Sequence, residues 1–353
     1  MKILKSALLF VVTSVFKKKL LYGIIVPVNT PGQLCHYFLQ KETVIKMNEI
    51  NTNEKSAFIA IVGRPNVGKS SLLNRMLGQK LAIVSSKPQT TRTRIMGVLT
   101  ENEVQLVFID TPGIHKPKNE LGKYMIRSVD ASVAGVDACL MVTEACEDIR
   151  DTEIKLIEKF KAMDIPAVLA INKIDTVNDK TRLMLQLARY GEMMDFEAIV
   201  PVSAQNGSGI EELKEELKKL SQEGGHLFDE DTLTDQPERV LAAEMIREKL
   251  LRLLDKEIPH GTAVVIERMR TRDESNIIDI DAVIYCERDS HKGIIIGKQG
   301  SMLKKIGTFA RQDMENFFNC KVNLKMWVKV KEDWRNRQGL LRSFGYDKND
   351  FEA

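Results

Sequence analysis

One segment of this chain has the pattern of a phosphate-binding loop: Gly63-Arg64-Pro65-Asn66-Val67-Gly68-Lys69-Ser70. The apolar run at 58–62 precedes it and is short enough to be a buried strand. Apolar residues at helical spacing follow it over 72–77, and Gly78 is a helix stop. The strand, the glycines, the Lys-Ser pair and the helix stand in the order that such a loop requires. This context disfavours the alternative, a glycine-containing turn without a ligand.

The residue types in this loop suit a polyphosphate. Gly63 and Gly68 let the backbone turn tightly, so that successive N–H groups face an anion at the N-terminus of a helix. Lys69 is expected to reach the β and γ phosphates of a nucleoside triphosphate, and the Ser70 hydroxyl is expected to bind Mg²⁺. The whole segment from Gly63 to Ser71 is therefore predicted to bind nucleotide.

From Ala57 to Leu220 the sequence alternates between short apolar segments and amphipathic ones. This alternation predicts an α/β fold with a doubly wound, mostly parallel sheet. Ligands of such a sheet lie at the carboxyl ends of the strands, and every candidate motif follows a predicted strand. After the first strand, the predicted strands are 93–99, 103–109, 138–142, 167–171 and 198–202, and the predicted helices are 151–162, 179–190 and 210–220.

The strand at 103–109 leads into Asp110-Thr111-Pro112-Gly113. The Asp110 carboxylate can hold the Mg²⁺ shell through water, and the Gly113 N–H is placed to sense a γ-phosphate. A plain turn is the alternative interpretation, because Pro-Gly pairs favour turns.

Two later strand ends carry Asn172-Lys173-Ile174-Asp175 and Ser203-Ala204. The Asp175 carboxylate can accept two hydrogen bonds from the edge of guanine, whereas adenine offers no matching donors. Asn172 and Lys173 are expected to brace the base and its loop, and the Ala204 N–H is expected to meet the guanine oxygen. A site that hydrogen-bonds its base rejects the wrong base strongly, because buried polar groups would be left unpaired. The sequence therefore predicts GTP and GDP binding with GTP hydrolysis, and disfavours an ATPase.

The three strand-end motifs, the phosphate-binding loop and Gln89-Thr90-Thr91-Arg92 together resemble the five motifs of translation-factor-class GTPases. With the residues that follow Gln236, the chain resembles the Era family of bacterial GTPases from about Met47 to the C-terminus. The resemblance implies that Thr91 is the switch threonine that closes on Mg²⁺, with Thr90 as the alternative register. It also implies that Lys69, Thr91 and Gly113 serve catalysis.

Ile114 stands where Ras-like enzymes carry the glutamine that orients the attacking water. An apolar side chain cannot do this, so hydrolysis is expected to be slow or to use water held by backbone groups and a bound cation. In related GTPases with an asparagine in the phosphate-binding loop, here Asn66, that cation is K⁺. His115 could act as a base, but an exposed loop histidine is the favoured interpretation.

An acidic stretch with Gly224-Gly225 and Pro237 follows, and residues 221–238 are predicted to form a mobile linker. Residues 239–346 then alternate in the order α-β-β-α-α-β, with a Gly-x-x-Gly loop between the two central helices. This order resembles a type II KH domain, an α+β fold, followed by a short C-terminal helix at 333–346 packed over the strand edge. The predicted helices are 240–254 and one that ends at Phe318, and the predicted strands are 262–268, 276–286 and 322–330.

The Gly-x-x-Gly loop of a KH domain clamps about four nucleotides of single-stranded backbone, beside an apolar groove that takes the bases. Charge supports such a site: residues 291–346 hold twelve Lys and Arg against four Asp and Glu, whereas the rest of the chain is net acidic. A solvated helix face is the alternative origin of these lysines. The predicted RNA-binding residues are Lys292, Gly293, Gly297, Lys298, Gln299, Gly300, Lys304 and Lys305.

The length of 353 residues fits two domains, of which the nucleotide-binding one is predicted at 47–220. The five cysteines have no metal-ligand spacing and indicate reduced thiols in a cytosolic protein. Residues 1–46 fit neither domain, and their apolar run at 7–16 is too short to span a bilayer. They are a membrane-touching extension, a signal peptide or translated upstream sequence; the last is favoured because a nucleotide-binding domain follows directly.

The resemblance implies a GTP-switched protein that binds single-stranded 16S ribosomal RNA near its 3′ end and assists assembly of the 30S subunit. It also implies a cytoplasmic monomer. The alternative is a membrane-associated signalling GTPase linked to cell growth or the cell cycle, whose N-terminal apolar run and basic second domain would touch the cytoplasmic face of the membrane. Retention on single-stranded ribosomal RNA rather than on anionic vesicles separates the two.

Overall fold

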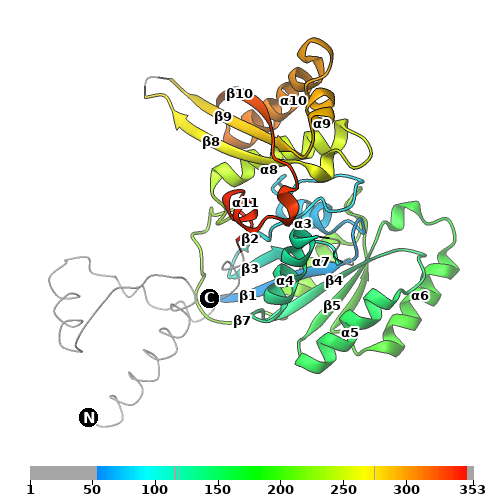
Figure 1. Cartoon of the computed structure of the whole chain (residues 1–353). Helices are drawn as coiled ribbons and strands as arrows, with labels where there is room; N and C mark the ends of the chain where they lie inside the picture. Colours follow the sequence, from blue (N-terminus) through cyan, green and yellow to red (C-terminus); the bar gives the residue numbers. More distant parts are fainter. Residues whose placement is uncertain (1–53, 115–116, 118, 274, 348–353) are drawn as a thin grey trace, which may run out of the picture. The chain divides into compact units, whose positions relative to one another are not determined.

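The computed structural model describes residues 54–114, 117, 119–273 and 275–347 (Figure 1). The extension predicted at 1–46 and the histidine His115 lie outside these residues. The described elements belong to one compact unit with two sheets, one of seven strands and one of three. In this described part of the chain, no helix is long and apolar enough to cross a membrane.

The first sheet has the strand order β2-β3-β1-β4-β5-β6. Strands β3, β1, β4, β5 and β6 pair in parallel, while β2 runs antiparallel to β3 and β7 pairs antiparallel with the start of β1. The predicted doubly wound, mostly parallel sheet is therefore confirmed. Its strands are β1 (Lys55–Gly63), β2 (Ile95–Glu101), β3 (Val104–Asp110), β4 (Ala138–Glu144), β5 (Ala167–Asn172), β6 (Ala198–Pro201) and β7 (Gln222–Glu223).

Helices cover both faces of this sheet, as its continuously apolar strands require (Figure 1). Leu73 of α3 and Leu213 of α7 pack in the core of one face. Val129, Ile157 and Tyr190, from α4, α5 and α6, pack in the core of the other. These helices are α3 (Lys69–Leu77), α4 (Glu120–Val133), α5 (Asp151–Met163), α6 (Lys180–Met193) and α7 (Ile210–Lys218), with a short turn, η2 (Ile174–Thr176), after β5.

Helix α4 was not among the predicted elements. Its buried face holds small and polar side chains beside the apolar ones. Gly122, Ser128 and Ser132 share that face with leucine, methionine, tyrosine and valine side chains. The Ser132 hydroxyl donates to the Ser128 carbonyl at 2.7 Å, which satisfies a buried polar group inside the helix. Asn119 caps the N-terminus by accepting from the Gly122 N–H at 2.8 Å. Leu121, Met125, Val129 and Val133 nevertheless recur every four residues on the buried face, so the sequence held a helical period that the prediction missed.

The segment 221–238, predicted to be a mobile linker, instead hydrogen-bonds to the first sheet. Its β7 residues pair with β1, and the Val98 N–H of β2 donates to the Leu233 carbonyl at 2.8 Å. The Gln105 side chain of β3 accepts from the N–H groups of Leu227 and Phe228 at 2.7 and 2.9 Å. Most of these contacts use backbone groups of the segment, so its polar composition did not reveal them.

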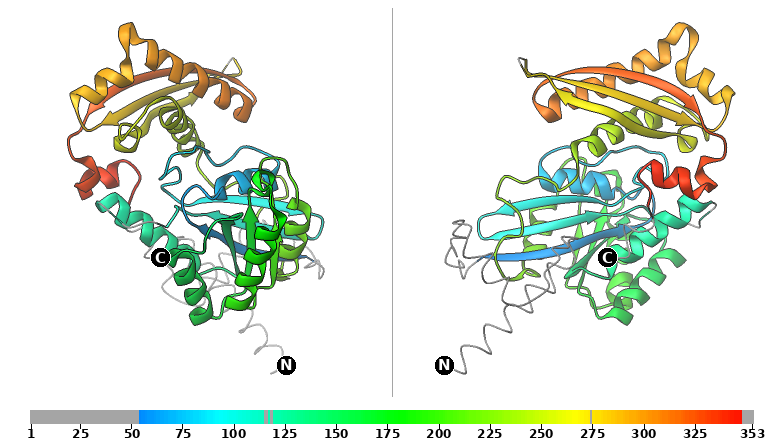
Figure 2. Two further views of the ribbon diagram at one scale, coloured as in Figure 1. Left: turned by 90° about the vertical axis from the view of Figure 1, so that its right-hand side faces the viewer. Right: turned by 60° about the vertical axis from the view of Figure 1, so that its left-hand side comes forward.

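The second sheet has the order β10-β9-β8, with β9 parallel to β10 and antiparallel to β8. Helices α8, α9 and α10 pack against it (Figure 2), and Ile246, Ile295 and Met314, one from each helix, share its core. The chain order confirms the predicted type II KH arrangement. Its elements are α8 (Glu238–Leu253), β8 (Ala263–Thr271), β9 (Ile277–Cys286), α9 (Asp289–Ile296), α10 (Ser301–Phe318) and β10 (Lys321–Val330), with η3 (Pro259–Gly261) before β8 and η4 (Lys298–Gly300) before α10.

The chain after β10 forms two short helical pieces, η5 (Trp334–Asn336) and α11 (Gln338–Ser343). The segment was predicted to be one short helix packed over the strand edge, but it packs on the central strand β9 of the second sheet, where Phe344 stacks on Tyr285 with ring centroids 4.5 Å apart. It also contacts the first domain, where Tyr346 meets Tyr124 of α4 edge to face at 5.7 Å. Figure 2 shows the segment in red beside α4. The C-terminal segment therefore connects the two domains.

Replacing Gln105 by leucine should release the segment after β7, because the N–H groups of Leu227 and Phe228 lose their acceptor. We expect the free energy of unfolding to fall by about 1–3 kcal/mol. We also expect faster hydrogen exchange at these two amides. Gln236→Leu is the matched control, since among the described residues the Gln236 side chain hydrogen-bonds to its neighbour Asp235 and to no other residue. Equal destabilisation in chemical denaturation of the two variants would contradict this assignment.

Candidate functional site

The phosphate-binding loop connects the end of β1 at Gly63 to the start of α3. Gly68 caps α3 with a φ of 99°, and a Cβ atom there would lie 2.2 Å from Nδ2 of Asn172. Glycine alone suits both the left-handed backbone and this close approach. The loop therefore lies at the carboxyl edge of the sheet, packed against the end of β5, as the motif predicted.

Lys69 is 6% exposed and its ammonium group spans the loop. Its Nζ donates to the carbonyls of Gly63 and Arg64 at 3.1 and 3.0 Å. Burial lowers the pKa of Lys69 to about 8, although the Asp110 carboxylate acts to raise it. An anion placed against this ammonium would favour its charged form.

The side-chain oxygens of Ser70, Thr91 and Asp110 converge beside Lys69. Ser70 Oγ donates to Asp110 Oδ2 at 2.6 Å, and Thr91 Oγ1 lies 3.0 Å from Ser70 Oγ and 3.3 Å from the same carboxylate oxygen. Oδ1 of Asp110 is buried and has no hydrogen-bond partner among the described residues, and burial raises the pKa of this carboxyl. Oxygen ligands with one unsatisfied carboxylate oxygen suit Mg²⁺.

The same geometry distinguishes the two neighbouring threonines that the sequence left open. Thr90 Oγ1 donates to the Lys87 carbonyl at 2.7 Å and lies 2.9 Å from Ser85 Oγ, so it is bonded within its own loop. Thr91 is buried and reaches the other two members of the oxygen cluster. The structure therefore places Thr91, and not Thr90, in this cluster.

The residues predicted to recognise the base lie together at the ends of β5 and β6. Asn172 donates through Nδ2 to the Val67 carbonyl at 2.9 Å and accepts from the Ala204 N–H at 3.0 Å. Asn172 therefore braces two loops, and it engages the Ala204 N–H that we expected at the guanine oxygen. Asp175 is exposed, and the Ser203 hydroxyl donates to its Oδ1 at 2.5 Å. This hydrogen bond, which the sequence did not predict, orients the carboxylate.

Two charged residues predicted to contact nucleotide make ion pairs in this structure, and their contact with nucleotide stays a prediction. Arg64 Nε lies 2.8 Å from the carboxylate of Glu153, which is almost fully buried in α5. Lys173 Nζ lies 2.8 Å from the carboxylate of Glu144 at the end of β4. In this structure both side chains brace the loops around the site.

The residues on either side of the expected γ-phosphate position pack closely. A Cβ atom on Gly113 would lie 2.7 Å from Cα of Pro65, so the two loops touch. The Ile114 N–H donates to the Gly63 carbonyl at 3.3 Å, and its side chain packs against the apolar core. Asn66 donates through Nδ2 to the Ser86 carbonyl at 2.9 Å, which joins the phosphate-binding loop to the loop before Thr91.

A groove of about 540 Å³ runs between α10 and β10 of the second domain. Leu303, Leu324 and Met326 make part of it apolar, while Lys304 and Arg311 supply positive charge. The sequence predicted an apolar groove without naming these residues, although helical spacing in α10 and alternation in β10 carry the signal. The lining residues are Gly300, Leu303, Lys304, Gly307, Thr308, Arg311, Val322, Asn323, Leu324 and Met326.

The Gly-x-x-Gly loop lies at one end of this groove, directly after α9. Gly297 and Gly300 have φ values of 73° and 78°, and Gln299 has a φ of 52°. Lys298 and Gln299 are exposed, and no atom lies within 4 Å of a Cβ built on Gly300 among the described residues. The turn is therefore open to a ligand. Of the remaining predicted RNA-binding residues, Lys304 lines the groove, whereas Lys292, Gly293 and Lys305 do not.

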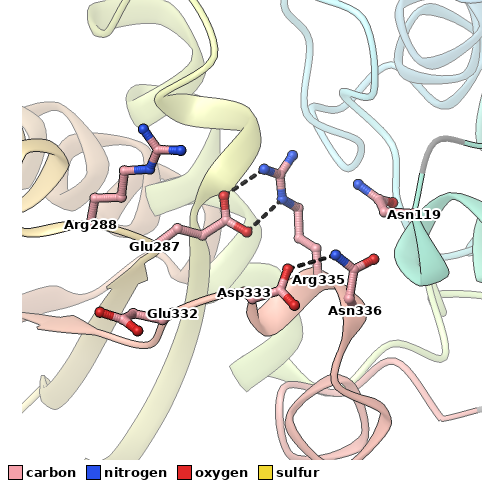
Figure 3. Close-up of a pocket in the computed structure, with 7 residues that line it drawn as sticks. All are labelled: Asn119, Glu287, Arg288, Glu332, Asp333, Arg335 and Asn336. Carbon is pink, nitrogen blue, oxygen red and sulfur yellow. Dashed lines mark hydrogen bonds and ion pairs between the residues drawn. The ribbon is translucent and has the colours of Figure 1, made fainter.

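A separate polar cavity of about 600 Å³ lies beside the α4 cap (Figure 3). Glu287 accepts hydrogen bonds from two nitrogens of Arg335, and Asn336 donates to Asp333 at 2.6 Å. Because these groups already satisfy each other, we assign no ligand to this cavity. Its lining residues are Asn119, Glu287, Arg288, Glu332, Asp333, Arg335 and Asn336.

Both halves of the chain match known families. Residues 58–173 match the family described as 50S ribosome-binding GTPase, and residues 257–335 match the KH domain family. The chain is 50% identical over 293 residues to GTPase Era of Clostridioides difficile, a match that covers 83% of this chain and 99% of that protein. It is 49% identical over 295 residues to GTPase Era of Ruminiclostridium cellulolyticum, covering 84% and 98%.

Two solved Era structures resemble this one, each with 40% sequence identity and each covering 83% of this chain and 99% of the other. A variant of Aquifex aeolicus Era bound to GDP·AlF₄⁻ superimposes with a TM-score of 0.80. Era in complex with MgGDPNP and nucleotides 1506–1542 of 16S ribosomal RNA superimposes with a TM-score of 0.78.

Proposed function

Since the chain belongs to the Era family of GTPases, we propose that it is a GTP-driven switch protein that binds single-stranded 16S ribosomal RNA near its 3′ end and assists 30S assembly. The observation that carries this proposal is that one compact unit combines the oxygen cluster of Ser70, Thr91 and Asp110 with a basic groove that ends at Gly300. The similarity to the Era complex with MgGDPNP and 16S nucleotides supports both halves of the proposal.

We assign the polyphosphate of GTP to the backbone N–H groups of residues 66–70 and to the Lys69 ammonium. Asp175, oriented by Ser203, accepts hydrogen bonds from the guanine edge. Asn172 keeps the base loop and the phosphate-binding loop at a fixed distance from each other. The Asp175 carboxylate therefore selects the base, while Ser203 and Asn172 hold the loops around it in place.

Ser70, Thr91 and, through water, Asp110 would hold Mg²⁺, which would neutralise charge on the phosphates. The Gly113 N–H lies in the loop that touches Pro65 and is assigned to the γ-phosphate. Ile114 packs into the core, so the attacking water must be oriented by backbone groups. The requirement for K⁺ beside Asn66 stays a prediction.

On the second domain, we assign the RNA backbone to the Gly297–Gly300 turn and the bases to the apolar part of the groove. Lys304 and Arg311 attract the phosphates at the groove, while Lys292 and Lys305 contribute attraction from outside it. Action as a monomer stays a prediction from the family resemblance. We place this action in the cytoplasm, where the protein would meet ribosomal subunits.

Lys69 should make GTP binding depend on pH. Below its pKa of about 8 the ammonium is already charged, so binding takes up no proton at this group. Above that pH the free protein holds Lys69 increasingly neutral, whereas bound phosphates favour the charged form. Affinity for GTP should then fall by up to about tenfold per pH unit. Calorimetric titrations in two buffers should show proton uptake that rises from zero near neutral pH; no uptake one unit above the pKa would contradict the assignment.

Replacing both Lys298 and Gln299 by aspartate should abolish RNA binding, because negative charge would face the phosphates at the turn. Both side chains are exposed, so the fold and GTP binding should persist. Binding of a single-stranded 16S 3′-end oligonucleotide, followed by fluorescence anisotropy, measures the effect.

The matched control carries the same charge change on the first domain, as Lys219→Asp with Gln222→Asp, at two other exposed positions. This control should bind RNA like the unmodified protein. If the variant at the turn also keeps that affinity at moderate salt, the Gly-x-x-Gly turn is not the RNA site.

A further inference from the structure

The loop between α3 and β2, which contains Thr91, lies along α8 of the KH domain. The Val84 N–H donates to Glu248 Oε1 at 3.0 Å, and Arg252 Nε donates to the Val84 carbonyl at 3.1 Å. Earlier in the loop, Lys80 Nζ lies 2.7 Å from Glu248 Oε2. The Glu248 side chain is fully buried between the loop and α8. Through its contacts with Val84 and Lys80, this side chain of the second domain holds the early part of the loop.

Arg247 of α8 holds the backbone just before Thr91. Its guanidinium is 1% exposed and donates to the carbonyls of Gln89 and Thr90. Glu244, one turn earlier on α8, accepts from Arg247 Nε at 2.7 Å and fixes the direction of the guanidinium. Although burial acts to lower the pKa of Arg247, the Glu244 carboxylate raises it overall, so the side chain stays charged.

Arg92 holds the backbone just after Thr91. Here the anchoring side chain comes from the loop and inserts into the second domain, whereas Arg247 comes from the second domain and contacts the loop. Its guanidinium is fully buried and donates to the Thr262 carbonyl at 2.6 Å and the His260 carbonyl at 2.9 Å. The guanidinium carbon lies 5.9 Å from the ring centroid of Trp334, in the C-terminal segment. Residues on both sides of Thr91 are therefore anchored to the KH domain.

We propose that Arg247 and Arg92 are positioning residues for GTP binding and hydrolysis. By anchoring the loop to the KH domain, they keep the Thr91 hydroxyl at the oxygen cluster. This inference rests on the role proposed above for Thr91. A hydroxyl on a loop has a fixed position only if its backbone is fixed, and these two guanidinium groups fix it on either side. A loop that is ordered in advance loses less conformational entropy when the ligand binds.

The proposal predicts a difference between GTP and GDP. In GTPases the switch loop is ordered by contacts to the γ-phosphate and Mg²⁺ and is released after hydrolysis. Anchoring the loop should therefore strengthen binding of the triphosphate and leave binding of the diphosphate unchanged. If the same contacts only pack two domains together, their loss should lower stability and affect both nucleotides equally.

Arg247→Lys tests the proposal in the full chain. Lysine keeps a positive charge beside Glu244, which preserves the buried pair, but one ammonium cannot replace a planar guanidinium that also bonds two carbonyls. We expect affinity for a non-hydrolysable GTP analogue to fall about tenfold, together with GTP turnover, while affinity for GDP stays unchanged. Equilibrium binding and steady-state hydrolysis measure these three quantities.

Arg252→Lys is the matched control, because Arg252 lies on the same helix and contacts the loop at Val84, away from Thr91. It should behave like the unmodified protein. A second control combines Arg247→Lys with Thr91→Ala: if Arg247 acts through Thr91, the double variant should lose no more than Thr91→Ala alone. Additive losses, or a parallel loss of GDP affinity, would overturn the proposal.

Thr91→Ala by itself separates this proposal from the proposed function. If it binds and hydrolyses GTP like the unmodified protein, the role assigned to Thr91 is wrong, and the positioning role of Arg247 fails with it. If Thr91→Ala is impaired but Arg247→Lys is not, the proposed function stands and only the positioning role is overturned.

Discussion

A buried guanidinium needs acceptors around it, because removing a charged group from water costs several kcal/mol unless its N–H groups are paired. Arg92 is fully buried, and its two terminal nitrogens donate to the carbonyls of Thr262 and His260, with the Trp334 ring across its face. Its buried Nε has no hydrogen-bond partner among the described residues. The two carbonyls and the ring belong to the KH domain, while Arg92 directly follows Thr91. Burial of this one side chain therefore connects the nucleotide switch to the position of the second domain.

The connection extends to the groove proposed to bind RNA, through the packed helices α8 and α10. Asp313 of α10 accepts from Lys80 of the switch loop at 2.6 Å and from Lys249 of α8. Arg311, half a turn earlier on α10, lines the groove. The loop that carries Thr91 therefore contacts the same two helices that lie beside the groove. If a ligand at one site moves these helices and thereby changes the affinity for a ligand at the other site, the second ligand changes the affinity for the first by the same factor.

Local sequence pattern was sufficient for the phosphate-binding loop, for the strands of a doubly wound, mostly parallel sheet and for the KH order of elements, because each of these leaves a signal among residues that are close in sequence. The prediction omitted α4, although Leu121, Met125 and Val129 recur every four residues there, because the buried serines beside them lower the apolar content of the segment. It also could not show contacts between distant positions. Asn172 was predicted to brace the base and its loop, but its hydrogen bond to a residue 105 positions away, in the phosphate-binding loop, was not predicted. Arg247 bonds a residue 158 positions away, and nothing in the composition of α8 marks it.

Hydrogen exchange tests the central claim that the switch and the KH domain act together. The measurement follows two segments: residues 85–92 of the loop, and residues 259–262, which include His260 and Thr262, whose carbonyls accept from Arg92. Exchange is compared between the protein bound to GDP and the protein bound to a non-hydrolysable GTP analogue. The account predicts that both segments gain protection together when the GTP analogue replaces GDP. Protection gained by residues 85–92 alone, with residues 259–262 unchanged, would contradict it.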